Sequence, residues 1–113
     1  MQIGIRKKRR VCIVEVTGRL TLDEGDEVLR GKLDELLATG ERSFVFNLNG
    51  LSVIDSAGIG EIVACYQRAL EGGAVLKIAL RADGLVRHVF EYAGLDRALE
   101  IFDEEDDAVA SYR

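Results

Sequence analysis

Several features that would by themselves define a function are scarce in this 113-residue sequence. No apolar run approaches the roughly 20 residues that a membrane-spanning helix needs. In the N-terminal segment 1–10 the charges follow the apolar residues, which is the reverse of a secretory signal. We therefore expect a cytoplasmic protein that has no membrane association.

The residues that most often carry chemistry are also few. The two cysteines, Cys12 and Cys65, lie inside expected elements without metal-ligand spacing, so we expect reduced packing residues rather than a metal site. His88 is the single histidine, which limits acid–base chemistry near neutral pH. The formal net charge of −5 disfavours a nucleic-acid partner and permits a protein partner with a basic face. No bound cofactor is expected.

The composition, 48% apolar and 31% charged, is typical of one soluble domain, which we expect to span residues 1–113. Alternation, β-branched runs and helical periodicity predict the order β-β-α-β-α-β-α-β-α. This order indicates an α/β fold with a mixed, mostly parallel sheet, one antiparallel hairpin at its edge and about four α-helices. The expected strands are 2–6, 11–16, 44–48 with 51–54 after a turn at Asn49-Gly50, 74–80, and a short one that ends the connector 95–101.

The first helix is expected to begin at Thr21 or Asp23, because Thr21-x-x-Glu24 has the spacing of a capping box. Its apolar face ends at Gly40, a natural C-terminal residue for a helix. The third helix precedes Gly94, and the acidic run 103–107 begins the last one, where its charge complements the helix dipole. The apolar faces are Val28, Leu29, Leu33, Leu36 and Leu37 in the first helix and Leu85, Val86, Val89 and Phe90 in the third.

Two charged runs have a structural and a functional interpretation. The basic run 6–10 fits a solvated hairpin turn, and the alternative is an electrostatic patch. For the acidic run 103–107 the alternative to helix capping is an acidic binding tail.

The segment 51–60 is where we expect the function to lie. A short apolar run ends in Asp55-Ser56, and a helical pattern follows at Ile59, Ile62, Val63, Tyr66 and Leu70. A serine hydroxyl is therefore expected at the start of a helix, where backbone N–H groups lack partners and the dipole favours negative charge. A phosphate on Ser56 would meet such a terminus.

Residue types alone leave other interpretations of this segment open. Helix capping by Asp55, Ser56 or Gly58, with Glu61 reaching back, is the simplest. A serine hydrolase would need the first glycine of Gly-x-Ser-x-Gly, which is absent, and Gly58-Ile59-Gly60 lacks the rest of a phosphate-binding loop. A phosphoaspartate at Asp55 would need further carboxylates for Mg²⁺.

The string Asp55-Ser56-Ala57-Gly58-Ile59-Gly60 resembles the signature of the STAS domain found in bacterial anti-sigma factor antagonists. The likeness covers nearly the whole chain. It includes segment 16–20 before the first helix, Phe46-Asn47-Leu48, Gly72-Gly73, and segment 90–95 at the end of the third helix.

This resemblance implies a switching cycle. The unmodified antagonist binds an anti-sigma factor, a serine kinase of the histidine-kinase-like ATPase fold, and so frees a sigma factor. Phosphorylation of Ser56 separates the complex, and a metal-dependent serine phosphatase restores the binding form. The antagonist itself, expected to be a monomer, contributes no catalytic group, and ATP belongs to the kinase.

The resemblance also implies where partners bind. Asp55, Ala57, Gly58 and Ile59 are expected contacts beside Ser56, while Ser52 is expected to be less reachable. The loop before the first helix also faces partners in this family. At position 21 members of this family often have an acidic residue, whereas this chain has Thr21. Asp23 lies near enough to provide the acidic contact in its place. Alternatives are a STAS scaffold that does not switch, a transporter-associated STAS module, and a small enzyme using Ser56 or Asp55.

Overall fold

The computed structural model describes residues 1–23 and 26–112. Five strands and five helices occur in these residues, in an order that confirms the predicted α/β class with one helix added. The strands are β1 (Gln2–Lys8), β2 (Val11–Leu20), β3 (Ser43–Ile54), β4 (Val75–Ala79) and β5 (Ile101–Phe102). The helices are α1 (Asp26–Ala38), α2 (Ser56–Glu71), α3 (Leu85–Tyr92), α4 (Leu95–Ala98) and α5 (Glu105–Ala110). The added helix is α4, four residues inside the expected connector.

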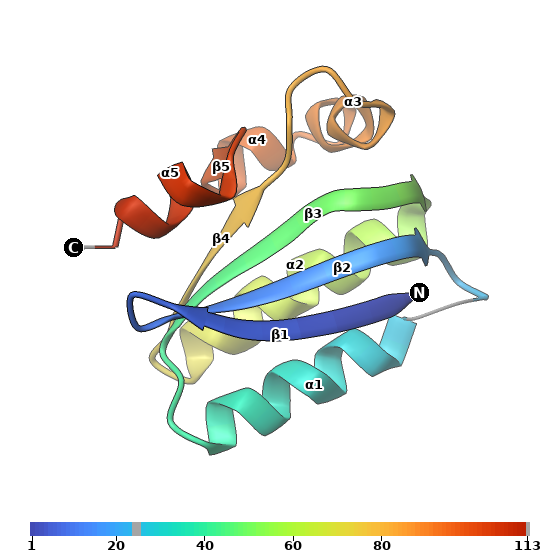
Figure 1. Cartoon of the computed structure of the whole chain (residues 1–113). Helices are drawn as coiled ribbons and strands as arrows, with labels where there is room; N and C mark the ends of the chain where they lie inside the picture. The colour runs from blue at the N-terminus through green and yellow to red at the C-terminus, as the bar shows by residue number, and fades with distance from the viewer. Residues whose placement is uncertain (24–25, 113) are drawn as a thin grey trace.

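The strands form one mixed sheet in the order β1-β2-β3-β4-β5 (Figure 1). β1 pairs antiparallel with β2, and the other neighbouring pairs are parallel. The predicted antiparallel hairpin at the sheet edge is therefore confirmed. Because β2 and β3 are parallel, the end of β3 and the β1–β2 hairpin turn lie at opposite ends of the sheet.

Helices pack on both faces of the sheet, as the alternation of β2 requires. Cys12, Val14 and Val16 point into the larger core cluster, which contains residues of α1, α2 and α3. Val11 and Ile13 point into a smaller cluster under α5, with Ala108 and Val109. This double burial explains why the central strands read as nearly continuous apolar runs. Both cysteines are free and buried, as expected, and burial raises the pKa of Cys65 to about 12.

The predicted turn at Asn49-Gly50 is wrong, because β3 runs without interruption from Ser43 to Ile54. The turn residues instead coincide with irregular pairing, since the β2–β3 register shifts between Glu15 and Thr17 and again between Gly18 and Arg19. Gly50 allows the two strands to approach closely there: a Cβ at this position would lie 2.5 Å from Cγ2 of Thr17.

Some residues predicted to face the core are exposed. Val28 is 62% exposed, Leu70 49% and Leu85 74%. The buried face of α2 consists of Gly58, Glu61, Ile62, Cys65 and Ala69, so it is rotated relative to the predicted stripe. This buried face includes a carboxylate, that of Glu61, which points at α1 and binds Arg30 there.

The described part of α1 begins at Asp26. Thr21 does not begin the helix, because the turn residues Leu22 and Asp23 follow it. The alternative start at Asp23 and the capping box to Glu24 depend on residues 24–25, which lie outside the described residues. Within those residues, no helix combines the length and apolarity needed to cross a membrane.

Candidate functional site

The corner between β3 and α2 is built around the carboxylate of Asp55. Asp55 is the N-cap of α2, in an extended conformation, and its Oδ1 accepts a hydrogen bond from the Gly58 N–H at 2.9 Å. The capping interpretation of this segment is thus confirmed, with Asp55 as the cap. Glu61 does not reach back to the corner; it binds α1 instead.

The second oxygen of Asp55 connects the corner to the segment that precedes α1. Oδ2 accepts a hydrogen bond from the Leu22 N–H at 3.0 Å, and the Asp55 N–H donates to the carbonyl of Leu20 at 3.4 Å. The bonds from Leu22 and Gly58 lower the pKa of Asp55 below its ordinary value. Asp55 therefore stays ionised near neutral pH and fixes two segments that are 33 residues apart in sequence.

Gly58 allows α2 to approach the sheet closely. A Cβ on this residue would lie 2.2 Å from the carbonyl oxygen of Leu20 and 2.7 Å from Cγ1 of Ile54. Gly58 is buried, and Thr21 is only 6% exposed. Both had been expected at the partner interface. In the free chain both pack inside the corner, and their contact with a partner stays a prediction.

The other expected contact residues lie at the surface. Ser56 is the exposed first residue of α2, Ala57 and Ile59 are half-buried, and Asp23 is exposed. The first intrahelical bond joins the Ile59 N–H to the Asp55 carbonyl at 2.9 Å. Added negative charge on Ser56 would therefore stand at the positive end of the helix dipole.

Ser52 is more reachable than the sequence suggested. It is exposed, and its hydroxyl donates to the Gly18 carbonyl at 3.0 Å. A recess of about 160 Å³ between the end of β3 and the start of α3 is lined by Ser52 and Leu51 and not by Ser56. Ser52 is therefore the natural comparison residue for any experiment on Ser56.

Sequence reasoning assigned Glu61 to the helix cap and missed its contact with α1. Glu61 is 2% exposed, and its carboxylate accepts hydrogen bonds from the Arg30 side chain at 2.6 Å and from the Arg30 backbone N–H at 3.1 Å. Asp55 and Glu61 thus hold α2 against Leu22 and against α1, respectively. The sequence does contain one sign of this buried contact: an acidic residue lies on the same helix face as Gly58, Ile62 and Cys65.

The described residues offer no ready catalytic constellation at this corner. His88 lies in α3, a separate element, and both oxygens of Asp55 already accept backbone hydrogen bonds. No group of three metal-ligating side chains gathers anywhere in segments 1–23 and 26–112. What the corner presents is an accessible hydroxyl beside a fixed negative charge.

Comparison with known proteins places this architecture in a family. The chain belongs to the STAS domain family, whose family model matches residues 2–108. An anti-sigma F factor antagonist of Lysinibacillus sphaericus is 32% identical over 88 residues, which cover 77% of this chain and 74% of that protein.

Solved structures agree with the fold. An anti-sigma factor antagonist from Mycobacterium paratuberculosis superimposes with a TM-score of 0.84 at 18% identity, over 97% of this chain and 92% of its own. The Bacillus cell fate determinant SpoIIAA in its phosphorylated form has a TM-score of 0.67 at 23% identity, over 99% and 100% of the two chains.

Proposed function

We propose that this chain is an anti-sigma factor antagonist whose binding is switched off by phosphorylation of Ser56. The observation that carries the proposal is the exposed Ser56 hydroxyl at the first position of α2, beside the ionised Asp55. Support also comes from relatives that are named anti-sigma F factor antagonists. A structural neighbour that has been solved in a phosphorylated form is compatible with such a switch.

In the unmodified state the binding surface consists of Ser56, the half-buried Ala57 and Ile59, and Asp23 in the neighbouring loop. Asp55 contributes by holding this surface together through its bond to Leu22. The proposed partner is an anti-sigma factor that is also a serine kinase of the histidine-kinase-like ATPase fold. The partner supplies ATP, so the antagonist needs neither cofactor nor metal and is not an enzyme.

Phosphorylation changes the charge of this surface more than its shape. A phosphate adds about −1.5 to −2 charges at neutral pH. Within the free antagonist the N-terminal end of α2 partly stabilises that charge, so the fold is retained. Inside an interface, the dianion meets Asp55 and the partner's ATP phosphates without water to screen it. A loss of about 3 kcal/mol would weaken binding on the order of a hundredfold.

A serine phosphatase that removes the phosphate from Ser56 would complete the cycle. In this scheme the antagonist acts as a cytoplasmic monomer, and repulsion at the corner is sufficient without a rearrangement of the sheet.

The test is a phosphorylation assay with purified anti-sigma factor kinases from the source genome. The wild-type chain should gain one phosphoryl group that peptide mass spectrometry places on Ser56. The Ser56→Ala variant should gain none and should stay bound to the kinase in the presence of ATP. Ser52→Ala is the matched control, because Ser52 is also exposed and only four residues away. Phosphorylation of Ser52 in its place, or no binding by the unmodified chain, would contradict the proposal.

A further inference from the structure

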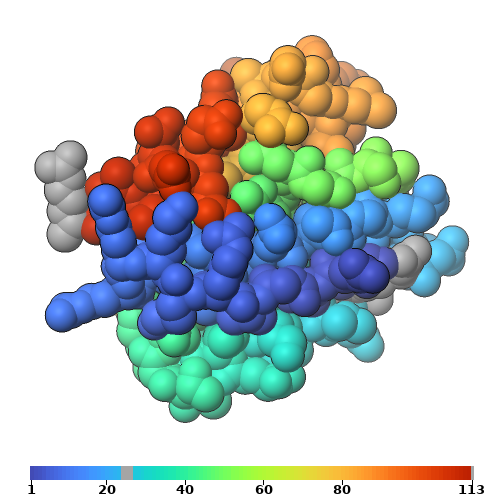
Figure 2. Space-filling view, in the orientation of Figure 1, coloured from blue at the N-terminus to red at the C-terminus, as the bar shows by residue number. Residues whose placement is uncertain are grey.

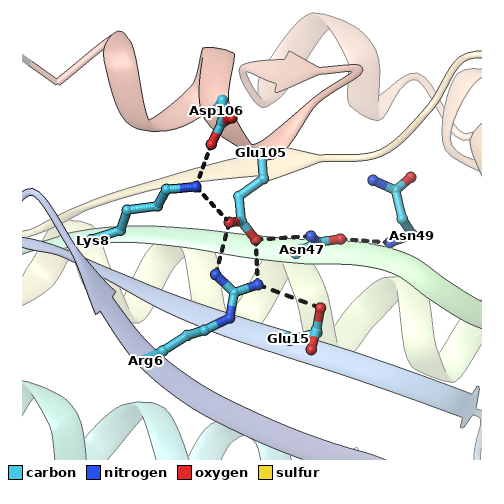
Figure 3. Close-up of polar contacts among 7 residues, drawn as sticks. All are labelled: Arg6, Lys8, Glu15, Asn47, Asn49, Glu105 and Asp106. Atoms are coloured by element: carbon cyan, nitrogen blue, oxygen red, sulfur yellow. Dashed lines mark hydrogen bonds and ion pairs between the residues drawn. The ribbon is translucent and has the colours of Figure 1, made fainter.

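The basic run Arg6–Arg10 divides into two groups with different surroundings. Arg6 donates to both carboxylate oxygens of Glu105, at 2.8 and 2.7 Å (Figure 3). Lys8 binds Asp106 and lies 3.6 Å from Glu105, while Lys7 binds Glu41 at 2.6 Å. These three charges hold the hairpin to α5 and to the segment before β3, so they are compensated within the chain.

Arg9 and Arg10 form the hairpin turn and have a different conformation. They connect Lys8 and Val11, which pair with each other, and their φ angles are 53° and 69°. Two-residue hairpin turns with positive φ strongly favour Asn, Asp and Gly, because these residues adopt that conformation most readily. Two arginines are therefore the wrong choice for stability alone. Residues kept in such conformations often serve a function.

Both arginines border the same recess. It has a volume of about 220 Å³ and is lined by Arg9, Arg10, Val11, Ser43 and Tyr112, a set with two cations and no carboxylate. Lys77, only 8% exposed, contacts the Tyr112 ring with its Nζ 4.3 Å from the ring centre, but its charge is compensated by Glu100 at 3.8 Å, so the two arginines supply the positive charge of the recess. Arg9 also borders a neighbouring recess beside Lys8, and that recess differs because Asp106 and Asp107 line it. A local positive surface thus exists on a chain of net charge −5.

We infer that this recess binds a small phosphate monoester. Two guanidinium groups match the charge of a phosphate dianion, and each presents parallel N–H donors of the geometry that phosphate oxygens accept. Val11 and Tyr112 provide apolar and aromatic surface for the organic part of the ester. The Ser43 hydroxyl is a further hydrogen-bonding group in the same lining.

The position of the recess makes it independent of the proposed switch. The hairpin turn precedes β2 and Ser56 follows β3, so the two sites lie at opposite ends of parallel strands (Figure 1). In the space-filling view the blue first hairpin extends past the red C-terminal helix at that end of the molecule (Figure 2). A ligand bound there would not cover Ser56.

A small ligand fits the charge distribution better than a polyanion. Nucleic acids and anionic membranes are bound through many cations spread over a surface. Here Asp106 and Asp107 line the adjoining recess that Arg9 also borders, so an anion that extended beyond the first recess would meet like charge.

The test is an NMR titration of the full chain, uniformly labelled with ¹⁵N, at constant ionic strength. Phenyl phosphate is the probe, inorganic phosphate separates the contribution of the phosphate from that of the ring, and benzoate controls for the ring with a single charge. Saturable shifts are expected at the amides of residues 8–11, 43 and 112. Binding should be strongest for phenyl phosphate, weaker for inorganic phosphate and weakest for benzoate.

Two variants make the test specific. Arg9→Ala/Arg10→Ala should weaken phenyl phosphate binding about tenfold or more, since it removes the charged donors. Arg9→Asn/Arg10→Gly installs the preferred turn residues, so it should raise the thermal unfolding midpoint while also losing the ligand. Arg97→Ala, at an exposed arginine of α4, is the matched control for charge and should leave binding unchanged.

Three outcomes would overturn the inference: shifts spread over the whole surface, retained affinity in the Asn-Gly variant, or tighter binding of an oligoglutamate peptide than of phenyl phosphate. None of these measurements uses Ser56 or a kinase, so the proposed antagonist function would stand or fall separately.

Discussion

Gly58→Ala tests whether the signature glycine serves the fold of the corner. The added Cβ would lie 2.2 Å from the Leu20 carbonyl oxygen, a backbone atom that cannot rotate away. Gly60 lies in the same helix, two residues later, and has no heavy atom within 4 Å of its Cβ position. Gly60→Ala is therefore a control with the same chemistry and no clash.

The two substitutions should change stability in opposite directions. Alanine in place of glycine inside a helix stabilises by roughly 0.5–1 kcal/mol, which is the whole effect expected for Gly60→Ala. At position 58 the same gain is outweighed by overpacking against backbone, which typically costs about 1–3 kcal/mol and here belongs at the upper end. We expect Gly58→Ala to lower the free energy of unfolding by about 2 kcal/mol, so the two variants should differ by about 3 kcal/mol.

Urea unfolding followed by circular dichroism measures this difference. With a slope of about 2 kcal/mol per molar, the urea midpoints of the two variants should lie about 1.5 M apart. A midpoint of Gly58→Ala equal to that of Gly60→Ala would refute the packing argument. The conclusion would then be that the corner opens to admit a methyl group at no cost.

Three further predictions concern charge. Ser56→Glu should weaken binding to the anti-sigma factor kinase in calorimetry by up to about a hundredfold, and Ser52→Glu by much less, because only Ser56 adjoins the cap of α2. Glu61→Ala should lower the urea midpoint more than Asp34→Ala, because the Glu61 ion pair is buried and the Asp34 ion pair is not. Glu61 is 2% exposed, whereas the side chain of Asp34, paired with Arg68, is 52% exposed. Equal losses would argue against a structural role for Glu61. The hydrogen bond from Arg6 lowers the pKa of Glu105 from its ordinary value of 4.5 to about 2, so the stability that Glu105 contributes is complete above pH 4.5 and is lost as the pH falls towards 2. As the pH is lowered across this range, the thermal unfolding midpoint should fall less steeply for Glu105→Gln than for wild type. Parallel curves of midpoint against pH would contradict the lowered pKa of Glu105.

Sequence reasoning succeeded where the signal is local. The alternation in β2 and the apolar run 44–48 predict strands, because the polarity of each residue there follows from its burial. Asp55 and the glycines after it mark the start of α2. These patterns were sufficient for the α/β class and for the position of the candidate site.

The failures have long-range causes. Asn49-Gly50 has the composition of a turn, but Gly50 is needed because Thr17 of the neighbouring strand passes close to it. Leu70 continues the apolar period of α2, yet it is exposed, and the buried face of the helix instead includes Glu61, which pairs with Arg30 of α1. Thr21 and Gly58 resemble surface residues of a signature loop, and only the contact between Leu20 and α2 reveals that they are inside. Apart from Glu61, an acidic residue on an otherwise apolar helix face, partners so distant in sequence leave no local trace.

The bonds of Arg6 and Lys8 to Glu105 and Asp106 have a consequence for synthesis of the chain (Figure 3). Arg6 of β1 leaves the ribosome 99 residues before Glu105, so the ion pairs between β1 and α5 form only after α5 has been made. Until then Val11 and Ile13 lack the cover of α5, and the outer surface of the sheet stays apolar and exposed. Folding of this half of the molecule is therefore completed only once α5 has left the ribosome, and the interval before α5 packs is when the nascent chain is most open to chaperones and to aggregation.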